Sequence, residues 1–139
     1  MEKPWYKLWP EVYPKSLQYY EGSIVDFLDA AVTRFPERPA LIFMEKAVSF
    51  RELRDQTLRL ATALFHMGVR KGDRVALFMP NCPQFAVAYY AVLRLGGIVT
   101  MCSPLNSEDE LKHQLNDAGA EILITLRSVS YTHLRAHET

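Results

Sequence analysis

The strongest constraint on the fold is a regular alternation of apolar and capped helical segments between residues 73 and 125. Three short segments in this range are continuously apolar, which is typical of strands that are covered on both faces. Short strands that alternate with helices pair in parallel. The pattern therefore predicts an α/β fold with a parallel sheet and helices on both faces. The predicted strands are 73–79, 98–102 and 121–125, and the predicted helices start at Asn81 (with Gln84) and Ser107 (with Glu110) and end at Gly96-Gly97 and Gly119.

Residues 23–68 predict two more helices on either side of a small hairpin. Each helix has a serine followed three residues later by an acid, the arrangement of a capping box, and each ends at a helix-breaking residue. The helices are expected from Ser23 (with Asp26) to Pro36 and from Ser49 (with Glu52) to Gly68, and the hairpin strands are expected at Ala40–Phe43 and Ala47–Val48, joined by a turn at 44–46.

Residues 1–22 form an arm that is rich in aromatic residues and proline and has no steady helical or strand period. Two interpretations are open: the rings pack into grooves as the arm crosses the surface of a body, or they meet a membrane surface as an interfacial aromatic cluster. We favour packing against the body.

Composition excludes several classes of protein. Sixteen basic residues balance sixteen acidic ones, so this portion lacks the basic excess that a nucleic-acid partner requires. No apolar stretch reaches the roughly 20 residues of a spanning helix, and the first ten residues lack the apolar core of a secretory signal. We therefore expect a cytoplasmic protein, with peripheral membrane contact as the alternative location. Cys82 and Cys102 have neither disulfide nor zinc spacing and are expected to be small buried residues.

The last residues, 128–139, do not resemble the rest of the chain. Residues His133, His137 and Glu138 suggest a metal site, but their order matches no zinc motif. Val129–Thr139 is instead the translation of DNA that resembles a transposase-type sequencing adapter, so 128–139 is predicted to be a non-native tail. The native portion is then about 127 residues of a longer enzyme, which accounts for a length that is short for a chain enclosing a cleft.

Catalytic motifs are absent from the native portion. It has no glycine-rich phosphate loop and no nucleophile elbow. Gly96-Gly97 is expected to be a helix stop, and His66 and His113 are expected to face solvent. Ligands of parallel α/β sheets bind beyond the carboxyl ends of the strands, which predicts Pro80-Asn81 and Ser103–Asn106 as cleft walls.

Three blocks of residues 23–125 resemble the start of the AMP-binding, or acyl-adenylate-forming, superfamily. Their order and spacing make the resemblance specific, and the arm and the helix at Ser107–Leu115 resemble those of bacterial long-chain fatty-acid coenzyme A ligases. The resemblance implies an incomplete N-terminal subdomain of that fold, with the arm at 1–22 and the partial AMP-binding domain at 23–127. The blocks are VSFREL at 48–53, KGDRVALFMPNCPQF at 71–85, and LRLGGIV at 93–99 with SPLN at 103–106.

The family implies ATP-dependent adenylation of a long-chain carboxylic acid, assisted by Mg²⁺, followed by thioester formation with coenzyme A. None of the family's catalytic, cofactor-binding or metal-binding motifs matches residues 1–127, so no residue is assigned to those roles and the 139-residue chain is predicted to be inactive. Two alternatives stay open: another acyl-adenylate enzyme, for an aryl, medium-chain or amino acid, or a non-catalytic α/β interaction module. The family often has glycine where this chain has Glu45, so the hairpin turn is expected to be strained or of another type.

Overall fold

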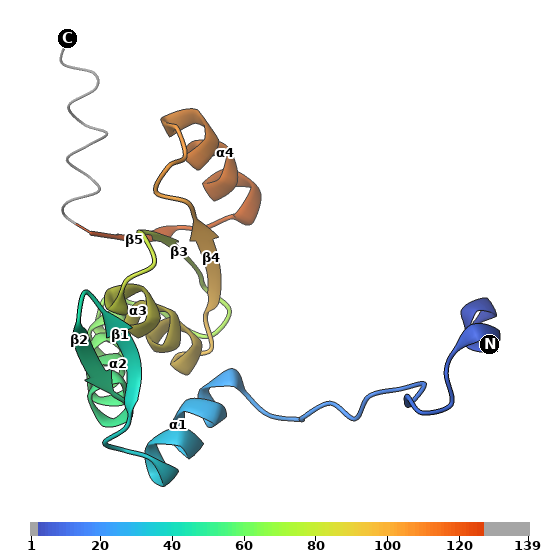
Figure 1. Ribbon diagram of the computed structural model, residues 1–139. Helices are drawn as coiled ribbons and strands as arrows, with labels where there is room; N and C mark the ends of the chain where they lie inside the picture. The colour runs from blue at the N-terminus through green and yellow to red at the C-terminus, as the bar shows by residue number, and fades with distance from the viewer. Residues whose placement is uncertain (1–2, 127–139) are drawn as a thin grey trace.

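The computed structural model describes residues 3–126, which form an α/β body and an N-terminal arm (Figure 1). The bounds of the elements agree closely with the sequence pattern. They are the 3-10 helix η1 (Pro4–Leu8), the helices α1 (Ile24–Arg34), α2 (Phe50–His66), α3 (Pro83–Arg94) and α4 (Glu108–Ala118), and the strands β1 (Pro39–Phe43), β2 (Lys46–Ser49), β3 (Arg74–Phe78), β4 (Ile98–Cys102) and β5 (Ile122–Thr125).

The centre of the body is a three-stranded parallel sheet with the order β4-β3-β5. Alternate residues of β3 face opposite cores. Val75 and Leu77 pack with α2 and α3 on one face, whereas Ala76 and Phe78 pack with Cys102 and α4 on the other. Figure 1 shows α3 and α4 on opposite sides of the sheet. The predicted α/β architecture, with helices on both faces and a separate antiparallel hairpin, is confirmed.

A further core joins the amino-terminal half of the body. Leu28 and Val32 of α1 pack with Leu53 of α2 and Val87 of α3, and side chains of the hairpin cover this cluster. The Arg94 guanidinium of α3 also lies 2.6 Å from the Asp29 carboxylate of α1. The hairpin and α1 are therefore fastened to the same two helices that support the sheet.

Three of the four predicted caps are confirmed. Ser23, Ser49 and Ser107 each accept from the backbone of the first turn, and the acid three residues later bonds back to the serine N–H. The cap predicted at Asn81 is wrong, because α3 has Cys82 as its N-cap, with no side-chain hydrogen bond. Proline at the first helical position is compatible with that arrangement, since its missing N–H needs no partner there.

The hairpin turn is strained at two residues. Phe43 pairs with Lys46, which leaves Met44 and Glu45 as the two turn residues, with φ of 47° and 66°. Positive φ at both positions is the geometry of a type I′ turn, in which glycine and asparagine are favoured. The strain expected at Glu45 is present in the structure.

The arm projects away from the body instead of lying across it (Figure 1). Most of its large apolar side chains are exposed, with Leu8 at 89% and Val12 at 81% of their full accessibility. The favoured interpretation, that the rings pack into grooves of the body, is therefore wrong for the described residues. The predicted non-native tail lies outside the described residues.

Candidate functional site

A hollow of about 380 Å³ opens at the carboxyl ends of β3 and β4. The two segments predicted as cleft walls, Pro80-Asn81 and Ser103–Asn106, meet here, because parallel strands bring their carboxyl ends to one edge of the sheet. The first segment leads into α3, and the second leads into α4. The lining residues are Met79, Pro80, Asn81, Phe85, Met101, Cys102, Ser103, Pro104 and Leu105.

A second hollow, of about 260 Å³, lies between the hairpin and the start of α3. It shares Asn81 and Phe85 with the first hollow, and its other wall includes Leu41 and Phe43 of β1. The amino-terminal end of α3 therefore separates two neighbouring hollows that are both mainly apolar. Nothing in the sequence pattern indicates that Phe85 borders two hollows.

The loop after β4 is held in place by side-chain hydrogen bonds. Gln114 of α4 donates from Nε2 to the carbonyl oxygen of Met101 at 3.0 Å and accepts at Oε1 from the Asn106 amide at 3.1 Å. Within the loop, the Leu105 N–H donates to Ser103 Oγ at 3.2 Å. Gln114 thus ties one wall of the larger hollow to the helix behind it. Its contribution was missed from sequence because the two partners lie 13 and 8 residues away.

The larger hollow has no acidic, basic or histidine side chain among its lining residues. Its thiol is unsuited to nucleophilic attack, because burial raises the pKa of Cys102 and keeps it protonated. Hydrogen bonds from Ser49 and Ser107 lower the pKa of Glu52 and of Glu110 respectively. Those two shifts arise from helix capping, so the perturbed carboxylates in the body have a structural explanation.

Several individual expectations are settled by the structure. Gly96 has φ of 73° at the end of α3, and the Gly97 N–H donates to the Val92 carbonyl, so Gly96-Gly97 is a helix stop as predicted. His66 and His113 are exposed as predicted. Cys102 is buried, whereas Cys82 is only half-buried. Among residues 3–126, no three His, Cys, Asp or Glu side chains gather to hold a metal ion.

Comparison with known proteins assigns the chain to a family. A model of the family described as AMP-binding enzyme matches residues 28–139. The chain belongs to the AMP-binding enzyme family. This agrees with the resemblance carried by the blocks at 48–53, 71–85 and 93–106.

Among curated members of the AMP-binding family, the long-chain-fatty-acid–CoA ligase of Bacillus subtilis (strain 168) is 40% identical over 125 residues, which is 90% of this chain. The match covers 22% of that ligase. The chain therefore spans about a fifth of the length of this curated relative.

Solved structures of the family share the fold. A long-chain-fatty-acid–CoA ligase from Archaeoglobus fulgidus superposes with a TM-score of 0.78 and 30% identity, over 87% of this chain and 26% of that one. The N-terminal subdomain of Klebsiella oxytoca NpsA, solved with 3-hydroxyanthranilyl-AMSN, gives a TM-score of 0.72 and 31% identity over 74% of this chain and 26% of that one. The body is thus an N-terminal portion of the adenylation-enzyme fold.

Proposed function

We propose that residues 1–127 are the N-terminal part of an AMP-forming acid–thiol ligase that activates long-chain fatty acids. The observation that carries this proposal is the 40% identity to the Bacillus subtilis long-chain-fatty-acid–CoA ligase across 90% of the chain. The Archaeoglobus fulgidus structure supports it, since it combines the same name with a TM-score of 0.78.

The proposed reaction has two steps. The carboxylate of the acid attacks the α-phosphorus of ATP, so that an acyl-adenylate forms and pyrophosphate leaves. The thiol of coenzyme A, after losing its proton, attacks the acyl carbonyl and displaces AMP to give a thioester. A divalent cation such as Mg²⁺ would neutralise phosphate charge in the first step.

The described residues do not fit a site for ATP, Mg²⁺ or coenzyme A on their own. The larger hollow is lined without charge, and its backbone leads into a helix whose first position is proline. The acids that begin α4 face the positive end of a helix dipole and include the cap residue Glu110. We therefore assign to this portion the role of scaffold and one apolar wall of the cleft, and no contact with ATP, Mg²⁺ or coenzyme A. The residues that bind ATP, Mg²⁺ and coenzyme A are proposed to lie beyond residue 127.

We further propose that the enzyme works in the cytoplasm and makes peripheral contact with a membrane, where long-chain acids partition. No helix among residues 3–126 is long and apolar enough to cross a bilayer. Exposed apolar side chains of the arm, such as Leu8 and Val12, are the groups that we propose for this contact.

The test is to clone the reading frame from the source DNA across codon 128 and assay its product beside the 139-residue chain. We expect palmitate-dependent exchange of pyrophosphate into ATP for the longer product and none for the 139-residue chain. Exchange by the 139-residue chain would contradict the assignment of the ATP groups beyond residue 127. A source reading frame that ends after Thr139, with no exchange, would favour a non-catalytic module.

Activation of an aryl acid is a second candidate. It is favoured by the likeness to Klebsiella oxytoca NpsA, whose N-terminal subdomain was solved with 3-hydroxyanthranilyl-AMSN at 31% identity to this chain. The same exchange assay with 3-hydroxyanthranilate and with palmitate separates the candidates. Exchange with the aryl acid alone would overturn the fatty-acid proposal while keeping the reaction.

A further inference from the structure

Residues 3–19 form a compact hook at the far end of the arm. Within it, Tyr6 packs edge-on against Trp5 and Trp9, with ring centroids 6.4 and 6.2 Å away. The Tyr6 hydroxyl donates to the carbonyl of Lys15 at 3.0 Å, and Trp9 Nε1 donates to the carbonyl of Tyr13 at 3.1 Å. These ring contacts and hydrogen bonds are all within the hook, and they stabilise its conformation.

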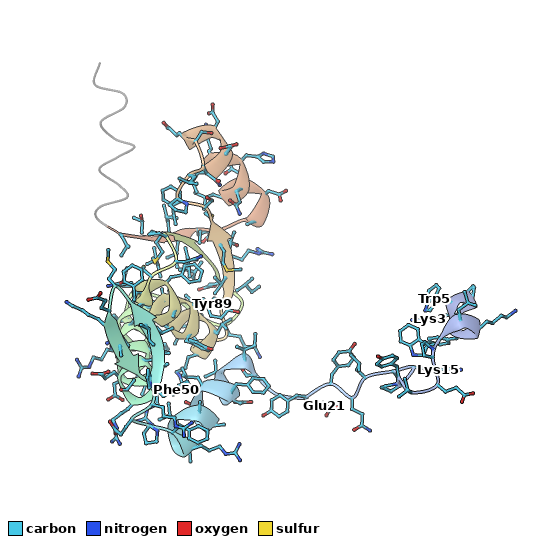
Figure 2. All side chains as sticks on the ribbon, viewed as in Figure 1. Lys3, Trp5, Lys15, Glu21, Phe50 and Tyr89 are labelled. Carbon is cyan, nitrogen blue, oxygen red and sulfur yellow. The ribbon has the colours of Figure 1, made fainter. Side chains whose placement is uncertain are left out.

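The hook is separated from the body by a short exposed link. Tyr20 joins the arm to the body, since its ring lies 5.0 Å from that of Phe27 and its hydroxyl donates to the Asp26 carboxylate at 3.3 Å. Figure 2 shows Trp5, Lys3 and Lys15 together at the outer end, with Glu21 in the link. The aromatic cluster of the hook therefore lies away from the core of the body (Figure 2).

The chemistry of the hook suits the boundary between lipid headgroups and acyl chains. Tryptophan, tyrosine and lysine are favoured there because each combines an apolar body with a polar end. Lys3 Nζ lies 5.5 Å from the centre of the Trp5 ring and Lys15 Nζ lies 5.4 Å from that of Tyr6, so two ammonium groups sit directly on the aromatic cluster. Leu8 and Leu17 add exposed aliphatic side chains.

Charge favours an anionic surface. The hook contains three lysines and one glutamate, and is bracketed by Glu2 and Glu21 in the flanking sequence. An open hollow of about 480 Å³ in the hook is lined by Trp9, Tyr13 and Leu17 with Lys15 beside them. An apolar hollow next to an ammonium group matches a lipid acyl chain next to its phosphate.

We propose that the hook docks onto the surface of a bilayer that contains anionic phospholipid. This specifies the membrane contact in the proposed function, but it does not require ligase activity. Lipid binding by the 139-residue chain and acid activation by the longer product are separate measurements, so one proposal can fail without the other.

The two tryptophans of the chain, Trp5 and Trp9, both lie in the hook, so tryptophan fluorescence reports on it alone. The 139-residue chain, cleared of aggregates, would be titrated with vesicles of equal parts phosphatidylglycerol and phosphatidylcholine. We expect a blue shift and flotation with these vesicles, both weaker with pure phosphatidylcholine. Absence of both responses to the anionic vesicles would overturn the proposal.

Matched variants separate the hook from other exposed residues. Leu8→Ser with Leu17→Ser keeps both tryptophans and is expected to abolish the shift, whereas Met67→Ser, on the body at 75% exposure, leaves it intact. Lys7→Gln and Lys15→Gln are each expected to weaken binding about five-fold, against no change for Lys46→Gln. Unchanged flotation of the variant with Leu8→Ser and Leu17→Ser would contradict the proposal. A blue shift that grows with protein concentration without vesicles would assign the hook to a second copy of the chain instead.

Discussion

The body and the arm are both rich in large apolar side chains, but the body buries many of them in its core, whereas most of those in the arm are exposed. In the body, Leu77 and Val75 of β3 are fully buried against α2 and α3. In the arm, Leu8 and Val12 are almost fully exposed, and Pro10 and Pro14 prevent a continuous helix from forming. A core therefore requires apolar residues at a period that fits a regular element, since content alone does not create one.

Substitution of one leucine in each region tests this contrast most strongly. Leu77→Ala is expected to lower the free energy of unfolding by about 2 to 5 kcal/mol, because it leaves a cavity in the centre of the sheet. Leu8→Ala is expected to change it by less than about 0.5 kcal/mol, since an exposed side chain leaves no cavity. Urea unfolding followed by circular dichroism measures both. A comparable loss for Leu8→Ala would show that the arm belongs to the cooperative unit of the body.

The same contrast explains which features were predictable from sequence. The caps at Ser23, Ser49 and Ser107 and the apolar strands are local patterns, and all of them appear in the structure. The start of α3 was misassigned, because Asn81 is a good capping residue but proline at position 83 places the N-cap at Cys82. The strand order depends on which faces pack together, which no local signal encodes.

For the candidate site, sequence predicted the position but little of the detail. The rule for parallel sheets placed Pro80-Asn81 and Ser103–Asn106 at one edge, and all of these residues except Asn106 line the larger hollow. The bridge made by Gln114 joins residues from β4 and the following loop, so it exists only once α4 has packed. The direction of the arm was also unpredictable, because residues without a period give no indication of what they contact.

Removal of the cap of α2 also compares the body with the arm, and the expected change in the free energy of unfolding is smaller. Ser49 accepts from the Glu52 N–H at 3.2 Å, and the Glu52 carboxylate accepts from the Ser49 N–H at 2.8 Å. Ser49→Ala is expected to lower the free energy of unfolding by about 1 kcal/mol. The control is Ser16→Ala in the arm, where the expected change is below about 0.5 kcal/mol. Thermal unfolding monitored by circular dichroism distinguishes them, and equal effects would show that the body does not depend on this cap.

The effect of Ser49→Ala is also expected to depend on pH. Hydrogen bonds from the Ser49 backbone N–H and from its hydroxyl lower the pKa of Glu52 below its usual 4.5 in the folded state, and Ser49→Ala removes the hydroxyl bond only. A lowered folded pKa contributes stability above the unfolded value, and that contribution is lost as the pH falls through the folded pKa. The difference between Ser49→Ala and the unaltered chain should therefore narrow as the pH falls below 4.5. A constant difference would mean that the serine hydroxyl acts without the carboxylate.

The smallest test concerns a place where the body itself departs from favourable geometry. Among residues 3–126, Met44 and Glu45 are the non-glycine residues with positive φ, and both lie in the β1–β2 turn. Glycine adopts this conformation without the steric cost of a Cβ atom, although it loses more entropy on folding. Glu45→Gly is therefore expected to raise the free energy of unfolding by up to about 1 kcal/mol, measured by urea unfolding. Glu45→Ala removes the same charge but keeps the Cβ atom, so it is expected to give no gain. Equal stabilisation by both variants would identify the glutamate charge, instead of the backbone conformation, as the cause.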